Sequence, residues 1–396
     1  MTTRPMPGSQ SSLREANRQR LLGALERYGA ITQVELAEVT GLSAATVSTI
    51  VKELLGTGEV DTRNTVRSGR RAQLVRLAQP SGLGVGVHVG RRSLRVLVGD
   101  QQHDVLAERS LPLPGDHRVD TTLDRVALLI VDLVEQIGSS IDEVGGIGVV
   151  LPAPVDPRTG LVSGRGVLSG WEGVAVGEVL SRRVRAPVVV ENDATAALIA
   201  ESRFGAARGC SDVVYVRASH LTGAGMLVGG RLHRGRRGIA GEIGHVEVDA
   251  AGAICQCGSR GCLNTVVGAD ALVDLLRISR SGITLRDLVA LANEGDPGCR
   301  QVVADAGATI GSVVAGLALA FDPECVVVGG ELAETGEILL GPLREAIRRR
   351  VMLTGDEAVR VLPAELGQRA EVRGAAALAF DAARPVAGAA AQGGVS

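Results

Sequence analysis

Three cysteines and one histidine gather in a short stretch of this sequence and could together bind a metal ion. Cys255, Cys257 and Cys262 lie in CQCGSRGCLN, and His245 stands ten residues earlier in AGEIGHVEVD. Cys255 and Cys257 are too close in the chain for an unstrained disulfide, and an odd number of thiols cannot all pair. One imidazole and three thiolates form a Cys₃His set that favours zinc in a closed tetrahedral site. The alternative is four metal-free side chains, with His245 hydrogen-bonded in a core.

The compartment follows from the start of the chain. Residues 1–20, MTTRPMPGSQSSLREANRQR, contain no apolar run of the kind found in a signal peptide. We therefore expect a cytoplasmic protein whose thiols stay reduced. We find no apolar run of the ~18–20 residues that cross a bilayer, so no membrane partner is expected.

The distribution of charge separates a basic head from an acidic body. Residues 1–76 carry 11 Lys and Arg and 7 Asp and Glu, a net charge of +4, whereas the whole chain of 396 residues has −2. This asymmetry is typical of a nucleic-acid-binding module joined to another domain. Hydrophobic residues make up 45% of the chain and aromatic residues only 2%, so the cores must be aliphatic.

From residue 83 onward, apolar runs typical of strands alternate with helical patterns, which predicts an α/β protein. We expect strands at 84–89, 94–99, 145–151, 187–192, 212–218 and 324–330, and helices at 119–138, 193–206, 268–279, 300–320 and 339–350.

Residues 31–60 have the pattern of two helices joined by a tight turn. Thr32 can cap the first helix, Gly41 supplies the turn, and Ser43 can cap the second helix. Val47, Ile50, Val51 and Leu54 recur at helical spacing and are expected to face inward. The candidate DNA-binding residues are the cap, the opposite face of small and polar side chains, and two arginines in a following turn: Ser43, Ala44, Ala45, Thr46, Ser48, Thr49, Lys52, Arg70 and Arg71.

This segment resembles the winged helix-turn-helix of bacterial repressors. Small side chains let a helix approach the major groove closely, and arginines at the tip of a strand pair suit contacts with phosphates. The alternative is a helical hairpin used for dimerisation, with a solvated basic face.

The motif GEIGH followed by CxCGxxGCL resembles the metal module of the ROK family, which contains sugar-responsive repressors and sugar kinases. The likeness runs from about residue 12 to about residue 380 and favours the regulator branch. It implies a winged helix-turn-helix followed by a two-lobed actin- and hexokinase-like fold, which is a ribonuclease H-like ATPase-type fold. We place the DNA-binding domain at 12–77, the first lobe at 83–190 with its C-terminal helix at 366–384, the second lobe with the zinc module at 191–365, and a flexible tail at 385–396.

The resemblance also implies a structural role for zinc and a sugar pocket beside it. The implied sugar-binding residues are Asn192, Asp193, Glu242, His245 and Asn264, the last replacing a glutamate of the family motif. In family kinases, the aspartate matching Asp193 is the general base that takes the proton of the attacked hydroxyl. Asn192 and Asp193 also suit a helix cap.

The phosphate chemistry of the family kinases is only partly retained. Their Asp-x-Gly-Gly-Thr turn reads GVHVGRRSLRV here, with His88 at the aspartate position and Arg91 and Arg92 in the turn. Imidazole is a poor ligand for Mg²⁺, so ATP with Mg²⁺ is not expected as a cofactor. Nucleotide-like turns remain at Thr222, Gly223 and Gly225, and at Gly329 and Gly330.

These features together predict a sugar-responsive transcriptional regulator, with a repressor as the family default. It would bind operator DNA as a homodimer or tetramer and a sugar or sugar derivative in its body. The alternative is an ATP-dependent sugar kinase of the glucokinase or N-acetylhexosamine kinase type, with Asp193 as its base and an added DNA-binding head. A third hypothesis is a zinc-stabilised scaffold that uses neither DNA nor sugar.

Overall fold

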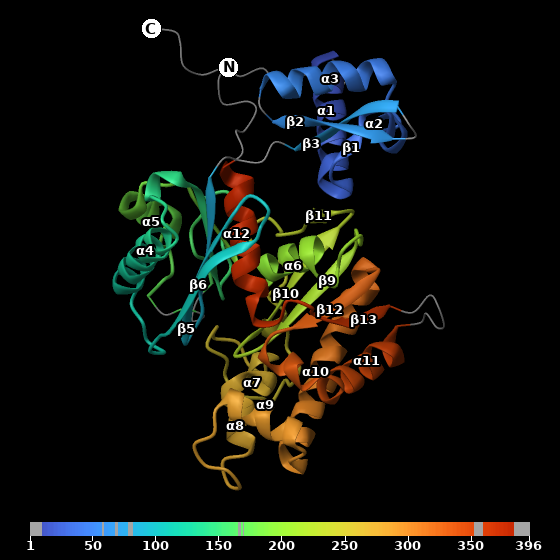
Figure 1. Ribbon diagram of the computed structural model, residues 1–396. Coiled ribbons are helices and arrows are strands. Elements are labelled where there is room, and N and C mark those ends of the chain that lie inside the picture. The colour runs from blue at the N-terminus through green and yellow to red at the C-terminus, as the bar shows by residue number, and fades with distance from the viewer. Residues whose placement is uncertain are drawn as a thin grey trace, which may run out of the picture. The chain divides into compact units, whose positions relative to one another are not determined.

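The computed structural model describes residues 10–57, 59–67, 70–77, 82–164, 168, 170–351 and 359–383 (Figure 1). The chain divides into two compact units, Met1–Ser81 with Ala382–Ser396, and Gly82–Asp381. The stretch 385–396, expected to be a flexible tail, lies outside the described residues.

The smaller unit is a helix-turn-helix followed by a strand pair. Its elements are α1 (Gln10–Tyr28), β1 (Ile31–Thr32), α2 (Gln33–Thr40), α3 (Ala44–Gly56), β2 (Val60–Arg67) and β3 (Arg70–Leu77). Thr32 and Glu35 form a reciprocal capping box at the start of α2, which ends at Gly41 with a φ of 66°. The Ser43 hydroxyl accepts a hydrogen bond from the Thr46 N–H at the start of α3. The predicted caps and turn are confirmed.

The core of this unit lies between its helices and its antiparallel sheet, whose strand order is β1-β3-β2. The predicted inward face of α3 is buried, because its four apolar side chains pack with residues of α1, β2 and β3. The buried residues of this cluster are Leu21, Ala24, Leu25, Leu36, Val47, Ile50, Val51, Leu54, Val60 and Val75. The residues on the opposite face of α3 are exposed.

The larger unit contains two lobes built on the same plan. The first sheet contains β4 (Leu83–Val89), β5 (Ser93–Gly99), β6 (Val105–Pro112), β7 (Val144–Leu151) and β8 (Val188–Asn192). The second contains β9 (Val213–Ala218), β10 (Thr222–Val228), β11 (Arg231–Leu232), β12 (Cys325–Gly329) and β13 (Arg360–Pro363). Their orders, β6-β5-β4-β7-β8 and β11-β10-β9-β12-β13, both run third, second, first, fourth, fifth in chain order. The predicted α/β organisation in two lobes is confirmed.

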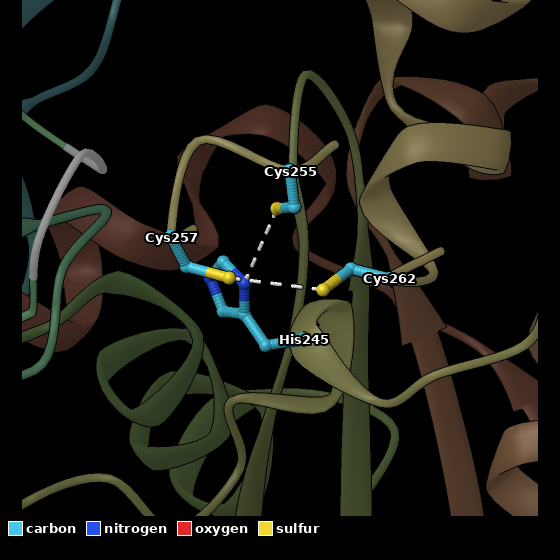
Figure 2. Close-up of side chains that lie close together, drawn as sticks. All are labelled: His245, Cys255, Cys257 and Cys262. Carbon is cyan, nitrogen blue, oxygen red and sulfur yellow. Dashed lines mark hydrogen bonds between the residues drawn. The ribbon is translucent and has the colours of Figure 1, made fainter. Parts of the chain in front are cut away.

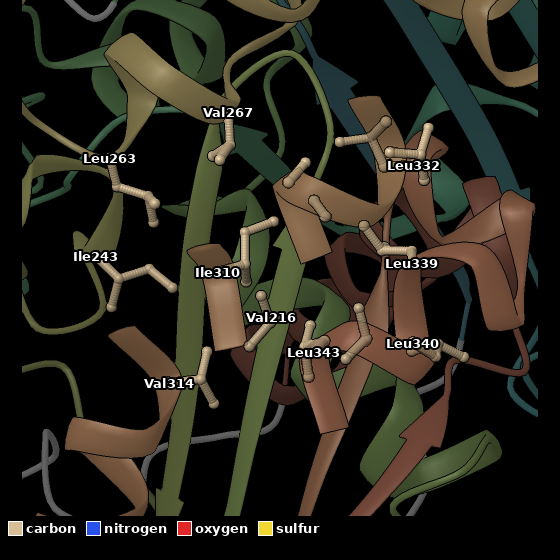
Figure 3. Close-up of a cluster of buried hydrophobic side chains, with 14 of the residues drawn as sticks. Val216, Ile243, Leu263, Val267, Ile310, Val314, Leu332, Leu339, Leu340 and Leu343 are labelled. Carbon is tan, nitrogen blue, oxygen red and sulfur yellow. The ribbon is translucent and has the colours of Figure 1, made fainter. Parts of the chain in front are cut away.

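Helices cover both sheets. The first lobe carries α4 (Val119–Gln136), α5 (Val176–Val184) and the short 3₁₀ turn η1 (Ile141–Glu143). The rest of the unit contributes α6 (Asp193–Phe204), η2 (Ile243–His245), α7 (Asn264–Val267), α8 (Ala269–Leu275), α9 (Leu285–Glu294), α10 (Pro297–Phe321), η3 (Glu331–Thr335), α11 (Glu337–Arg350), η5 (Gly367–Arg369) and α12 (Ala370–Ala383). Figure 3 shows the core of the second lobe, where valine and leucine side chains of the sheet, α10 and α11 interlock.

The C-terminal helix α12 packs directly on the first sheet because the central strands carry glycines. A Cβ at Gly86 would lie 2.2 Å from the Val372 carbonyl oxygen, and one at Gly148 would lie 1.9 Å from the Ala375 carbonyl oxygen. The same helix also contacts α6, since a Cβ at Gly374 would lie 1.8 Å from the Ala196 carbonyl oxygen. Helix α12 thus contacts both the first sheet and α6.

Two sequence predictions need correction. Thr222, Gly223 and Gly225 do not form a turn, because they begin strand β10. Gly225 is required there for close packing, since a Cβ would lie 2.8 Å from the Ala194 carbonyl oxygen of α6. The expectation that no apolar run is long enough to cross a bilayer is also wrong by composition, because α10 is long and apolar enough to do so. Its apolarity has a packing explanation, because its buried face contributes to the core of the second lobe.

The glycine contacts generate a test of α12 docking. Gly148→Ala should lower the free energy of unfolding by about 3 kcal/mol, because the added methyl overlaps the helix backbone. Gly316→Ala is the matched control, since nothing lies within 4 Å of a Cβ at that position in α10. The control should be stabilised by about 0.5–1 kcal/mol, because alanine favours a helix. Equal stability of both variants in urea unfolding would contradict the docking of α12.

Candidate effector site and metal centre

The four predicted metal ligands converge on one point, as Figure 2 shows. Their donor atoms all lie within 4.8 Å of one another. His245 Nδ1 lies 3.6 Å from Cys255 Sγ, and Cys257 Sγ lies 3.7 Å from Cys262 Sγ. A tetrahedral ion with metal–sulfur bonds of about 2.3 Å needs sulfur atoms roughly 3.8 Å apart. The cluster therefore fits a tetrahedral metal ion.

Backbone hydrogen bonds within the loop fix the conformation of the segment that carries the cysteines. The Cys255 N–H donates to the Ser259 carbonyl at 2.7 Å, and the Gly258 N–H donates to the Cys255 carbonyl at 2.9 Å. Gly261 has a φ of 63°, and a Cβ there would lie 1.6 Å from the Asp249 carbonyl oxygen. Only glycine fits this position, so the spacing of the thiols depends on it.

His245 links the metal cluster to the predicted sugar pocket. Its Nδ1 faces the thiols, while its Nε2 lies 3.9 Å from Glu242 Oε2. Burial, and then the negative charge of Asp193, raise the pKa of Glu242 to about 7. At neutral pH this carboxyl group is therefore partly protonated and can donate as well as accept a hydrogen bond.

The side chains of Asn192 and Asn264, which were predicted to bind a sugar, already accept hydrogen bonds from backbone N–H groups of the protein. Asn192 caps α6, and its Oδ1 accepts hydrogen bonds from the N–H groups of Ala194 at 2.9 Å and Thr195 at 3.2 Å. Asn264 begins α7, and its Oδ1 accepts a hydrogen bond from the Thr222 N–H at 2.7 Å. The helix-cap role of Asn192 is confirmed, and Asn264 connects the metal-bearing segment to β10.

Asp193 lies in a buried cluster of charged groups. Its Oδ2 is 3.4 Å from Arg217 Nε and 3.9 Å from His88 Nε2, the latter too long for a hydrogen bond. Arg217 Nε also donates to Glu371 Oε1 at 2.7 Å. Burial alone would raise the pKa of Asp193, but Arg217 and then His88 outweigh it and lower that pKa. Asp193 is thus held as a paired anion.

Sequence reasoning missed Arg217 and Glu371. Arg217 is the only charged residue of strand β9, and Glu371 lies in an alanine-rich helix, so each is a charge in an apolar element. A charge in a buried element needs a partner of opposite charge, so these two residues could have been identified from the sequence as members of buried ion pairs. Their pairing joins residues 154 positions apart in the chain and is not legible from the sequence.

Two adjoining cavities lie at the cleft of the larger unit. One, of about 180 Å³, is lined by residues that include His88, Arg91, Arg92, Arg217, His220 and Glu371. The other, of about 230 Å³, includes His245, Cys255 and Asn264 in its lining. Arg91, His220 and Leu221 line both cavities. Gly330 lines the first cavity with a φ of 92° and follows Gly329, the last residue of β12.

In the smaller unit, the predicted DNA-facing residues lie on one face of α3. Ser43, Ala44, Ala45, Ser48, Thr49 and Lys52 are exposed, and Thr46 is half-buried. The Thr49 hydroxyl donates to the Ala45 carbonyl at 2.9 Å, so one polar group on this face is partly engaged within the helix. Arg70 and Arg71 begin β3, and their side chains lie outside the described part of the structure.

A winged helix-turn-helix joined to a two-lobed body with a Cys₃His cluster defines a DNA-binding protein built on a sugar-kinase-like fold. The ROK family model matches residues 84–382, and the MarR family model matches residues 18–71. The chain belongs to the ROK family.

Three known proteins show what this chain is similar to. The DNA-binding transcriptional dual regulator NagC of Escherichia coli strain K12 is 30% identical over 386 residues, covering 92% of this chain and 94% of NagC. A crystal structure of a ROK transcriptional regulator, a homologue of the E. coli Mlc protein, aligns with a TM-score of 0.76 at 24% identity over 94% of this chain and 97% of its own. The ROK glucokinase of Streptomyces griseus, solved with glucose and AMPPNP, has a TM-score of 0.69 and 30% identity over 76% of this chain and 100% of its own.

The cluster geometry generates a test by metal analysis. The wild-type protein should contain one equivalent of metal, and Cys257→Ser should lose most of it because a tetrahedral site needs all four donors. Cys210→Ser is the matched control, since Cys210 is a half-buried thiol outside the cluster. Elemental analysis by mass spectrometry measures the content. Full metal content in Cys257→Ser, or none in the wild type, would contradict the assignment.

Proposed function

We propose that this protein is a sugar-responsive transcriptional regulator that acts as a repressor. The observation that carries the proposal is the presence of a whole winged helix-turn-helix on a ROK body. The match to NagC covers 92% of this chain. The match to the glucokinase covers 76%, about the share that the ROK family model spans by itself.

The DNA-binding surface is the exposed face of α3, with the wing formed by β2 and β3. Alanine and serine side chains there allow close entry into a major groove ~12 Å wide. Lys52 supplies a positive charge on the same face, and Arg70 and Arg71 are proposed to contact phosphates. We further propose a homodimer or tetramer, because a two-fold symmetric operator requires two DNA-binding units.

The effector site is proposed to bind a sugar through Asn192, Asp193, Glu242, His245 and Asn264. Zn²⁺ is proposed as the metal of the Cys₃His cluster, with a structural role. The geometry of His245 supports a metal at this position. Its Nδ1 faces the thiols, while its Nε2 can interact with Glu242 or with a sugar hydroxyl. Sugar binding would shift the population between states that differ in affinity for DNA.

A sugar kinase is the second candidate, favoured by the 30% identity to a glucokinase and by the position of Asp193 at the start of α6. Two observations oppose it. The pKa of Asp193 is lowered and its carboxylate is paired with Arg217, so it is a weak general base. His88 also stands where the kinases of the family have a carboxylate for Mg²⁺, and imidazole binds that ion poorly.

The DNA-binding proposal is tested by a gel shift with the DNA upstream of the protein's own gene. Ala45→Glu should abolish binding, because a carboxylate on α3 is repelled by the phosphate backbone. Ala290→Glu is the matched control, an exposed helical alanine on α9 of the larger unit, and should bind like the wild type. Glucose, N-acetylglucosamine and N-acetylmannosamine are then added in turn, and the effector should release the wild-type complex. Equal binding by both variants would contradict the α3 surface.

The kinase alternative is tested by incubation of the same sugars with ATP and Mg²⁺. The proposal expects no sugar phosphate above the level of a blank, because Asp193 is paired and the carboxylate for Mg²⁺ is missing. Phosphorylation that disappears in Asp193→Ala would instead establish the enzyme.

A further inference from the structure

We propose that Cys210 and Cys325 form a redox-sensitive thiol pair, which a hydroperoxide oxidises to a reversible disulfide. The inference goes beyond the proposed function and does not depend on it. Both residues are free cysteines, and neither belongs to the Cys₃His cluster. In a reducing compartment the pair would rest as two thiols and would be oxidised only when peroxide is present.

The two sulfur atoms lie in contact although their residues are far apart in the chain. Cys210 stands in the loop between α6 and β9, and Cys325 begins β12. The Cys325 thiol donates a hydrogen bond to Cys210 Sγ at 3.8 Å. A disulfide bond of about 2.05 Å needs a further approach of roughly 1.8 Å, which rotation of a side chain can provide. The fold therefore brings together two thiols separated by 115 positions.

Backbone contacts hold the loop of Cys210 against the start of β12. Glu324 Oε1 accepts hydrogen bonds from the N–H groups of Ser211 at 2.8 Å and Asp212 at 3.3 Å. In return, the Glu324 N–H donates to the Asp212 carbonyl at 2.8 Å. The chain neighbours of both thiols are thus tied together, which keeps the sulfur atoms close in the folded protein and favours a reaction between them.

The surroundings of the two thiols assign them different roles. Cys210 is half-buried, so a small peroxide can reach it, whereas Cys325 is fully buried. Burial, and then the neighbouring Cys210, raise the pKa of the Cys325 thiol to about 12, so this thiol stays protonated at neutral pH. Because the thiolate is the form that attacks a peroxide, Cys210 is the residue that reacts first.

Arg360 places a positive charge beside the reactive sulfur. It begins β13, and its partner across the parallel pair of strands is Cys325. Its Nη2 lies 3.5 Å from Cys210 Sγ, and the residue is exposed. A guanidinium in this position stabilises the negative charge that sulfur and the peroxide oxygens share during the attack. The pair is therefore placed for oxidation as well as for bond formation.

The oxidation takes place in two steps. The Cys210 thiolate attacks one oxygen of the hydroperoxide, so that an S–O bond forms and the O–O bond breaks. The second oxygen leaves as water or an alcohol with a proton from solvent, and the Cys210 sulfur, now a sulfenic acid, has lost two electrons. The Cys325 sulfur then attacks the Cys210 sulfur. The S–S bond forms, the S–O bond breaks, and the hydroxyl group leaves as water with the proton of the Cys325 thiol.

The experiment treats the purified, metal-containing protein with hydrogen peroxide, alkylates the remaining thiols in denaturant and maps the tryptic peptides by mass spectrometry. The peptides of Cys210 and Cys325 should appear joined, lighter by two hydrogen atoms than their sum, and should separate after treatment with dithiothreitol. Cys299 is the internal control, because burial raises the pKa of its thiol to about 11 and it should remain alkylated.

Two single variants separate the roles of the thiols. Cys325→Ala should leave the sulfenic acid on Cys210, where dimedone, a reagent for sulfenic acids, should label it. Cys210→Ser should abolish both the joined peptides and any dimedone label on Cys325. Arg360→Gln should slow formation of the disulfide by about fivefold, as expected for the loss of one exposed charge. Arg348→Gln is its matched control, an exposed arginine on α11 that pairs with Glu345, and should react like the wild type.

Three results would overturn the inference. The first is that Cys210 and Cys325 stay separate at a peroxide concentration that already oxidises Cys299. The second is that dimedone labels Cys325 in Cys210→Ser but leaves Cys210 unlabelled in Cys325→Ala. The third is that the joined peptides resist dithiothreitol, which would exclude a reversible disulfide. None of these results bears on DNA binding or on the sugar response, so the proposed function is tested separately.

Discussion

The organisation of the larger unit depends on the buried ion pairs of Arg217. This side chain extends from β9 of the second lobe to Asp193 at the start of α6 and to Glu371 on α12, which itself packs on the first sheet. Removal of one partner from such a cluster leaves an uncompensated buried charge, which typically costs about 3–5 kcal/mol. The pairing therefore fixes both the meeting point of the lobes and the chemistry of the cleft.

The pairing of Asp193 with Arg217 affects a role of Asp193 in ligand binding differently from a role in catalysis. A carboxylate already neutralised by a guanidinium can accept a hydrogen bond from a sugar hydroxyl, but it is a poor acceptor for a proton in transfer. The Cys₃His cluster lies on another side of the proposed pocket, where His245 Nδ1 faces Cys255 and Nε2 faces Glu242. The two adjoining cavities are thus lined by the metal-ligand cluster on one side and by arginine side chains on the other.

Local features of this protein were legible in the sequence, and long-range ones were not. The Thr32 and Ser43 caps and the Cys₃His spacing are set by residues a few positions apart, and the structure places them as expected. Strand β10 was missed because its glycines have the composition of a turn, whereas they serve the packing of α6. The pairing of Arg217 with Glu371 depends on how α12 returns to the cleft, which no local pattern encodes.

The most direct test is a titration with AMPPNP, a non-hydrolysable ATP analogue, in the presence and absence of Mg²⁺. In this protein, ion-paired side chains and arginines line the cleft where the kinases of the family bind nucleotide with a metal ion. This arrangement predicts that Mg²⁺ does not strengthen binding of the analogue, because His88 stands where the kinases of the family have a carboxylate for the ion. Tight binding that appears only with Mg²⁺ would contradict it and would place this protein among the kinases of its family.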